Sequence, residues 1–194
     1  MKKILHINAH QPYSFSQGKL NHSLTESAIS SLEEKGYNVD RTISAQPYDI
    51  KEELEKHKRA NFIILQTPVN WMGVPWSFKK YMDEVYSAGM GGDLCNGDGR
   101  TTEQPKLNYG GGGTLTNTQY MLSLTFNAPE ESFENDKEYL FQGKTVDDLF
   151  FPMHMNFRFF GMKALETFAC FDVMKNPQID KDLQRFSEHL NKVF

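Results

Sequence analysis

The sequence predicts an α/β protein with a doubly wound, five-stranded parallel sheet and helices on both faces. Short apolar segments alternate with helical segments along the chain, which is the pattern of right-handed βαβ crossovers. No linker, repeat or low-complexity tract interrupts this alternation. At 194 residues the chain has the length of one domain with some decoration. We therefore expect residues 1–194 to form a single domain.

The first half of the chain contains three predicted strands and two predicted helices. The first strand carries Ile4, Leu5 and Ile7, and the third is the apolar run 62–65, which suits strands buried in a parallel sheet. Gly36 is a natural stop for the first helix. The predicted elements are strand 3–8, helix 18–35, strand 38–44, helix 50–58 and strand 61–66.

The second half continues the alternation but includes one long insertion. A helix is predicted over 75–88, where Phe78, Met82 and Val85 recur at helical spacing. A glycine-rich insertion follows near 89–114, and long insertions of this kind often cover a site. The remaining predicted elements are strand 120–125, helix 145–160, strand 167–171 and helix 179–193.

Composition and charge exclude several classes of function. The hydrophobic share of 39% suits a folded globular protein. A net charge of −4 gives no general attraction for nucleic acid or an anionic membrane. No run approaches the roughly 20 apolar residues of a membrane span. Because the first strand begins near residue 3 without a cationic leader, we expect a cytoplasmic protein.

The cysteines, histidines and glycines match no familiar metal or nucleotide motif. Cys95 and Cys170 are too far apart for a Cys-x-x-Cys pair, and no histidine has a cysteine partner at zinc spacing. The glycine run 110–113 fits neither G-x-G-x-x-G nor a P-loop, and it precedes a strand. We therefore expect no metal site and no Rossmann-type phosphate loop.

Two loops that follow predicted strands favour a flavin site. The loop 9–20 leaves the first strand and enters a helix, where free backbone N–H groups, hydroxyls and the helix dipole can hold phosphate oxygens. The loop 67–76 carries Trp71 and Trp76 among proline and glycine, so a planar ring could lie against it. Ligands of open parallel sheets sit beyond the carboxyl ends of the strands, so these loops and 125–130 should converge.

Six ordered blocks of the sequence are similar to a known family. They are Ser16-x-Gly18-x-Leu20-Asn21, Gln66-x-Pro68-x-x-Trp71-Met72-Gly73-x-Pro75-Trp76, Lys79-Lys80-Tyr81, Asp98-Gly99-Arg100, Tyr120 to Thr125 with Asn127-Ala128-Pro129, and Phe160-Gly161-Met162. They resemble the modulator of drug activity B family of flavin-dependent NADPH:quinone reductases, relatives of DT-diaphorase with a flavodoxin-like fold. The resemblance covers nearly the whole chain.

The resemblance implies a bound FAD, with FMN as the alternative cofactor, NADPH as the electron donor, and a quinone or other planar molecule as the acceptor. It implies a cofactor site made of Ser16, Gly18, Leu20, Asn21, Ser23, Pro68, Val69, Asn70, Trp71, Met72, Tyr109, Thr125, Phe126, Asn127 and Ala128. Ser16, Gly18, Leu20 and Asn21 would cradle the pyrophosphate and ribityl chain. Residues 125–128 would offer main-chain hydrogen bonds to the ring.

The resemblance also implies which residues assist the reaction. Tyr109 would close over the site from the insertion, and Asn127 would help to stabilise charge on the reduced ring. An aromatic slot between Trp71, Tyr109 and Phe126 would hold nicotinamide and acceptor in turn. Arg100 is a candidate for the 2′-phosphate of NADPH. A homodimer is expected, because helix 145–160 carries more phenylalanine than one helix face needs.

The chain departs from the family pattern at a few positions, so other functions remain open. Ala9 replaces a small glycine, Val69-Asn70 replaces Gly-Trp, and Phe126 replaces tryptophan. The segment 154–157 lacks a family lysine. The alternatives are an FMN-dependent azo- or nitro-type reductase, a flavodoxin-like electron-transfer protein, and a noncatalytic regulatory protein that lost its cofactor.

Overall fold

A computed structural model describes residues 1–194 and confirms the doubly wound parallel sheet. The strands are β1 (Lys3–Asn8), β2 (Asn38–Ile43), β3 (Phe62–Pro68), β4 (Gln119–Thr125), β5 (Lys163–Ala164) and β6 (Phe168–Cys170). Their order is β2-β1-β3-β4-β5, with β6 also paired to β4, and every pairing is parallel. This is the flavodoxin-like order, whose topological switch lies between β1 and β3.

The fifth position of the sheet is divided between two short strands. β5 pairs with the start of β4, at Gln119 and Tyr120, and β6 pairs with its last three residues. The sequence pattern predicts only the second of these strands. A two-residue strand contains no alternation of apolar and polar side chains, so the sequence gives no signal for β5.

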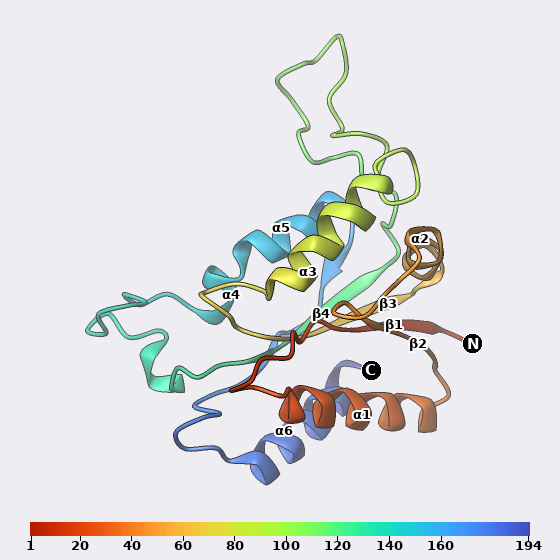
Figure 1. Cartoon of the computed structure of the whole chain (residues 1–194). Helices are drawn as coiled ribbons and strands as arrows, with labels where there is room; N and C mark the ends of the chain where they lie inside the picture. The colour runs from red at the N-terminus through yellow and green to blue at the C-terminus, as the bar shows by residue number, and fades with distance from the viewer.

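Helices cover both faces of the sheet (Figure 1). One face carries α1 (Lys19–Glu34) and α6 (Ile179–Val193). The other carries α2 (Ile50–Arg59), α3 (Trp76–Tyr81) with its π-helical continuation η1 (Met82–Tyr86), α4 (Val146–Leu149) and α5 (Phe151–Phe159). A short 3₁₀ turn, η2 (Glu130–Ser132), follows β4. No helix combines the length and the apolar character needed to cross a membrane.

The central strands place alternate residues in two hydrophobic cores. On β1, Leu5 and Ile7 belong to the core under α2, α3 and α5, whereas Ile4 belongs to the core under α1 and α6. On β3, Ile63 and Ile64 divide in the same way. This explains why these strands read as continuous apolar runs.

The helix predicted over 145–160 is two helices in the structure. α4 begins with a capping box formed by Thr145 and Asp148 and ends before Phe150, whose ψ of 12° breaks the helix. Pro152 lies in the first turn of α5. Proline has no N–H and restricts the residue before it, so it suits the start of a helix and not its middle.

The glycine-rich insertion lies at the opposite end of the sheet from the loops 9–20 and 67–76. It connects the end of the helix after β3 to the start of β4, and therefore lies beyond the amino ends of the parallel strands. Figure 1 shows this segment, in yellow-green, extending away from the far end of α3. Two isolated antiparallel β-bridges, Gly91 to Asn96 and Cys95 to Gly113, connect parts of the insertion to one another.

Candidate cofactor site

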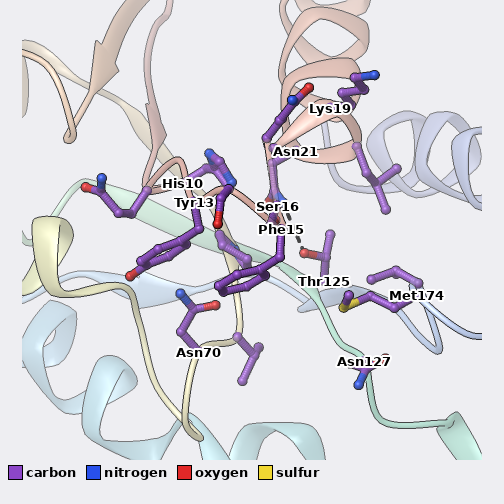
Figure 2. Close-up of a pocket in the computed structure, with 18 residues that line it drawn as sticks. His10, Tyr13, Phe15, Ser16, Lys19, Asn21, Asn70, Thr125, Asn127 and Met174 are labelled. Atoms are coloured by element: carbon purple, nitrogen blue, oxygen red, sulfur yellow. Dashed lines mark hydrogen bonds between the residues drawn. The ribbon is translucent and has the colours of Figure 1, made fainter.

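A cavity of about 510 Å³ lies beyond the carboxyl ends of β1, β3 and β4. This is the place where ligands bind in doubly wound sheets. Figure 2 shows the side chains around it. The lining residues are His10, Gln11, Tyr13, Ser14, Phe15, Ser16, Gln17, Gly18, Lys19, Leu20, Asn21, Pro68, Val69, Asn70, Thr125, Asn127, Val173 and Met174. The three loops expected from the sequence converge here, and the loop after β6 joins them.

The start of α1 provides a backbone cradle for an anion. Gly18 precedes the helix with φ of 75° and makes no side-chain cap. The N–H groups of Lys19, Leu20 and Asn21 donate no hydrogen bond within the chain, whereas the N–H of His22 donates to the Gly18 carbonyl. Uncapped N–H groups and the positive end of the helix dipole favour a phosphate at this position.

His10 lies against this cradle, although no sequence motif indicates a role for it. Its side chain is only 8% exposed, and its Nε2 atom has no hydrogen-bond partner. Burial lowers the pKa of His10, so the neutral ring can donate or accept one hydrogen bond. A Cβ atom on Gly18 would collide with the His10 ring. The signal that could have identified His10 is its position immediately after the first strand.

Two stacked aromatic rings form an outer wall of the cavity. The rings of Tyr13 and Phe15 lie 5.2 Å apart and nearly parallel, and the bridge between Tyr13 and Ser16 closes the turn that carries them. Phe15 is largely exposed. Val173 and Met174 add apolar surface from the loop after β6. The sequence motifs predict none of these four residues as part of the site.

The loop after β3 presents an amide to the cavity and a tryptophan to solvent. Asn70 lines the cavity and exchanges two backbone hydrogen bonds with Gly73. Between them, Trp71 and Met72 have φ of 49° and 64°, a conformation that costs free energy in residues with a Cβ. The Trp71 side chain is 98% exposed. Thus Pro68, Val69 and Asn70 reach the cavity of this chain, whereas Trp71 and Met72, which were also expected in the site, do not line it.

The segment after β4 contributes Thr125 and Asn127, but not Phe126. The Phe126 ring is buried in the core and stacks on Phe171. Its N–H donates to the Cys170 carbonyl at 2.8 Å, and its carbonyl accepts from Val173. Phe126 therefore does not form the aromatic slot that was expected. The N–H and side-chain amide of Asn127 have no partner within the chain, so they are free for a ligand.

Ser23 and Ala128 are two further expected residues that do not line the cavity. Ser23 lies on an exposed part of α1, one turn past the cradle. Ala128 packs against the core, and its carbonyl accepts a hydrogen bond from the Asp172 N–H at 3.0 Å.

Tyr109 lies in the insertion, at the other end of the sheet. It packs edge-on against Phe159, and the Arg100 guanidinium lies 5.4 Å from its ring centre. Arg100 in turn donates from Nε to Asp98 at 2.8 Å. Because the insertion lies beyond the amino ends of the strands, Tyr109 does not close over the cavity of its own chain. This corrects the expectation from the sequence.

The cavity has the features that a flavin nucleotide requires. An uncapped helix start and an orphaned buried imidazole suit its phosphate, Gly18 leaves room for that imidazole, and the free amides of Asn70 and Asn127 suit the polar edge of the ring. The stacked Tyr13 and Phe15 rings suit a planar group. The residues present therefore fit the cofactor that the sequence motifs imply.

Comparison with known proteins agrees with this fold. Residues 2–193 match the family described as having a flavodoxin-like fold. The chain is 44% identical over 192 residues to an uncharacterized protein of Schizosaccharomyces pombe, covering 99% of this chain and 97% of that protein. It is 41% identical over 191 residues to the NADPH:quinone oxidoreductase MdaB of Haemophilus influenzae, covering 98% of each.

A solved structure shares the fold at lower identity. The putative quinone reductase of Klebsiella pneumoniae superposes with a TM-score of 0.78 at 21% identity, over 99% of this chain and 85% of that one. The chain therefore belongs to the flavodoxin-like fold family, and within it to the modulator of drug activity B family that its motifs indicated.

Proposed function

We propose that the protein is an FAD-dependent NAD(P)H:quinone oxidoreductase that reduces quinones by two electrons in a ping-pong reaction. The observation that carries this proposal is the cavity at the switch point, where an uncapped helix start, a buried His10 and the free amide of Asn127 converge. Close similarity over the full length to a named NADPH:quinone oxidoreductase supports the same reaction.

The chain supplies binding, orientation and charge stabilisation. When bound, the flavin would take hydride from NADPH and pass two electrons to the acceptor. The N–H groups of Lys19, Leu20 and Asn21 would hold its phosphate, and His10 Nε2 would hydrogen-bond to it. The amides of Asn70 and Asn127 would serve the polar edge of the ring, where preorganised donors stabilise developing negative charge.

The proposed active unit is a homodimer that acts in the cytoplasm. Trp71, Trp76 and Tyr109 are exposed aromatic residues on this chain, and a second copy would bury them. We place Tyr109 at the partner's cavity, because the insertion that carries it points away from its own. Both cysteines are free and buried, which suits a reducing compartment.

Absorption spectroscopy of the purified protein, followed by identification of the released chromophore, tests the cofactor. We expect about one FAD per chain, bleached by NADPH and restored by menadione. Release of FMN would instead support the azo- or nitro-type reductase, to be tested with an azo dye and a nitroaromatic. A protein that binds neither flavin after reconstitution would contradict the proposed function and favour a noncatalytic role.

A further inference from the structure

A chain of buried amide and hydroxyl groups lies directly beneath the phosphate cradle. The Gln66 amide donates from Nε2 to Asn21 Oδ1 at 2.9 Å, and the Asn21 amide donates from Nδ2 to Thr125 Oγ1 at 3.2 Å. The chain Gln66–Asn21–Thr125 thus connects β3, α1 and β4. Figure 2 shows Asn21 directed toward Thr125, with a dashed line between them.

All three residues are shielded from solvent, but they differ in access to the cavity. Gln66 is fully buried and is absent from the cavity lining, whereas Asn21 and Thr125 belong to the lining. Hydrogen bonds between buried polar groups are expensive to break, because the remaining partner cannot turn to water. The chain therefore holds Asn21 firmly in one orientation.

Asn21 is the third residue of α1, so holding its side chain also holds the first turn of the helix in place. The N–H groups of Lys19, Leu20 and Asn21 form the cradle, and the φ of Gly18 aims them at the cavity. The Asn21 side chain uses both of its polar atoms inside the protein. It acts on the cradle by fixing the backbone, and not by extending its own amide to a phosphate.

We infer that Gln66 is a positioning residue that sets the preference of the site for phosphate-bearing flavins, by fixing the start of α1 through Asn21. This inference rests on the proposed function, because it assumes that the cavity takes a flavin. Riboflavin has the same ring as FMN and FAD but no phosphate. Loss of Gln66 should therefore weaken the binding of FMN and FAD and leave the binding of riboflavin nearly unchanged.

The test is titration of flavin-free protein with riboflavin, FMN and FAD, followed by flavin fluorescence. For Gln66→Met, which keeps the side-chain length and removes the donor, we expect Kd for FMN and FAD to rise about tenfold, the effect of one buried hydrogen bond. Kd for riboflavin should change less than about twofold.

Ser123→Ala is the matched control. Ser123 is the register neighbour of Gln66 on β4, is fully buried, lies outside the cavity lining, and has a hydroxyl without a partner. This variant should leave all three Kd values unchanged. If Gln66→Met raised Kd for riboflavin as much as Kd for FMN, the cause would be a general loss of structure, and the inference would be overturned.

A double-mutant cycle shows whether Gln66 acts through Asn21. If it does, Gln66→Met should add little to the FMN loss already caused by Asn21→Ala. Additive losses would overturn the inference, and so would normal FMN binding by Gln66→Met. A wild-type protein that binds no flavin would overturn the proposed function as well, so the two failures can be told apart.

Discussion

Gly18 decides whether the phosphate cradle can form. It combines a left-handed backbone, with φ of 75°, and close packing against the His10 ring. Glycine adopts this conformation without strain, whereas other residues do not. Both constraints act at the same residue. Any side chain at position 18 must therefore change the backbone conformation or displace the His10 ring.

Gly18→Ala should therefore impair flavin binding more than folding. We expect at least tenfold weaker FAD binding, because the methyl group displaces the His10 ring from the cradle, with stability lowered by about 1–2 kcal/mol. Gly36→Ala is the control, because Gly36 has φ of 83° but no atoms within 4 Å of the added methyl. The Gly36→Ala variant should be destabilised by about the same amount as Gly18→Ala and should bind FAD normally. Equal FAD affinity in the two variants would contradict this account.

The ion pair between Arg100 and Asp98 bears on the choice of nucleotide. The Asp98 carboxylate partly neutralises the guanidinium, so it would weaken, without removing, the attraction of Arg100 for the 2′-phosphate of NADPH. We expect Arg100→Ala to raise KM for NADPH more than for NADH, and Asp98→Ala to lower KM for NADPH. Steady-state kinetics with both nucleotides check this, and equal effects on the two nucleotides would remove Arg100 from the role.

His6 should make the protein sensitive to acid. Burial, with a further contribution from Arg41, lowers its pKa to about 3, and neither ring nitrogen has a partner. The unfolded chain takes up a proton near pH 6.5, so stability is complete above that pH and declines as pH falls toward 3. At pH 5 the loss is about 2 kcal/mol.

His6→Leu should remove this part of the acid sensitivity. Urea unfolding at pH 7.5 and pH 5 gives the free energy of unfolding of both proteins. Between pH 7.5 and pH 5 the wild type should lose about 2 kcal/mol more than the variant. His22→Gln, on the exposed side of α1, serves as the control and should follow the wild type. Parallel pH profiles for His6→Leu and wild type would refute the prediction.

At the element scale, one buried carboxylate connects β2, α2 and α3. Glu53 on α2 is 2% exposed. Its Oε2 accepts hydrogen bonds from Thr42 and Tyr81, each at 2.7 Å, and its Oε1 pairs with Lys56 at 2.7 Å. Burial and the Glu53 carboxylate raise the pKa of Tyr81, so the hydroxyl stays protonated as a donor. Three elements are thus held together by one charge.

Tyr81→Phe should destabilise the protein by about 1–3 kcal/mol, because it leaves a buried carboxylate without one donor. Tyr48→Phe is the matched control: its hydroxyl donates to Glu84 at 2.6 Å at a half-buried site, where water can replace it. It should cost less than about 1 kcal/mol. Urea unfolding compares the two, and an equal cost would argue against the buried connection.

At the scale of the whole molecule, the sheet separates the insertion from the cavity, so the proposed role of Tyr109 requires a second chain. In a dimer, Tyr109 of one chain would serve the cavity of the other. Light scattering should then give about twice the chain mass of 22.4 kDa. Phe151→Asp, on the exposed side of α5, should give a monomer, whereas Ile179→Asp on the opposite face should not. A wild-type monomer at micromolar concentration would contradict the proposal.

Mixing two inactive variants tests whether Tyr109 acts across the interface. In a mixed dimer of Gly18→Ala and Tyr109→Ala chains, one cavity is intact and receives Tyr109 from the other chain. Quinone reduction should therefore recover to about a quarter of wild type after random exchange, because half of the dimers are mixed and each has one good site. No recovery, with exchange verified by mass spectrometry, would place Tyr109 outside the partner's site.

The sequence by itself determined the fold and the region of the proposed cofactor site. Continuous apolar runs at 3–8 and 62–65 and the helix signals between them specify buried parallel strands, because this period and length depend only on local sequence. The position of the loops at the carboxyl ends then follows from topology. For this reason the sequence indicates one shared site for several residues that do line one cavity, namely Ser16, Gly18, Leu20, Asn21, Pro68, Val69, Asn70, Thr125 and Asn127.

The tertiary structure alone decided which side chains face that cavity. Phe126 turns into the core because its backbone joins β6, His10 is trapped beside Gly18, and Asn21 is turned inward by Gln66. Tyr109 lies at the far end of the sheet. Each of these outcomes depends on contacts between residues distant in sequence, and local sequence patterns contain no information about such contacts.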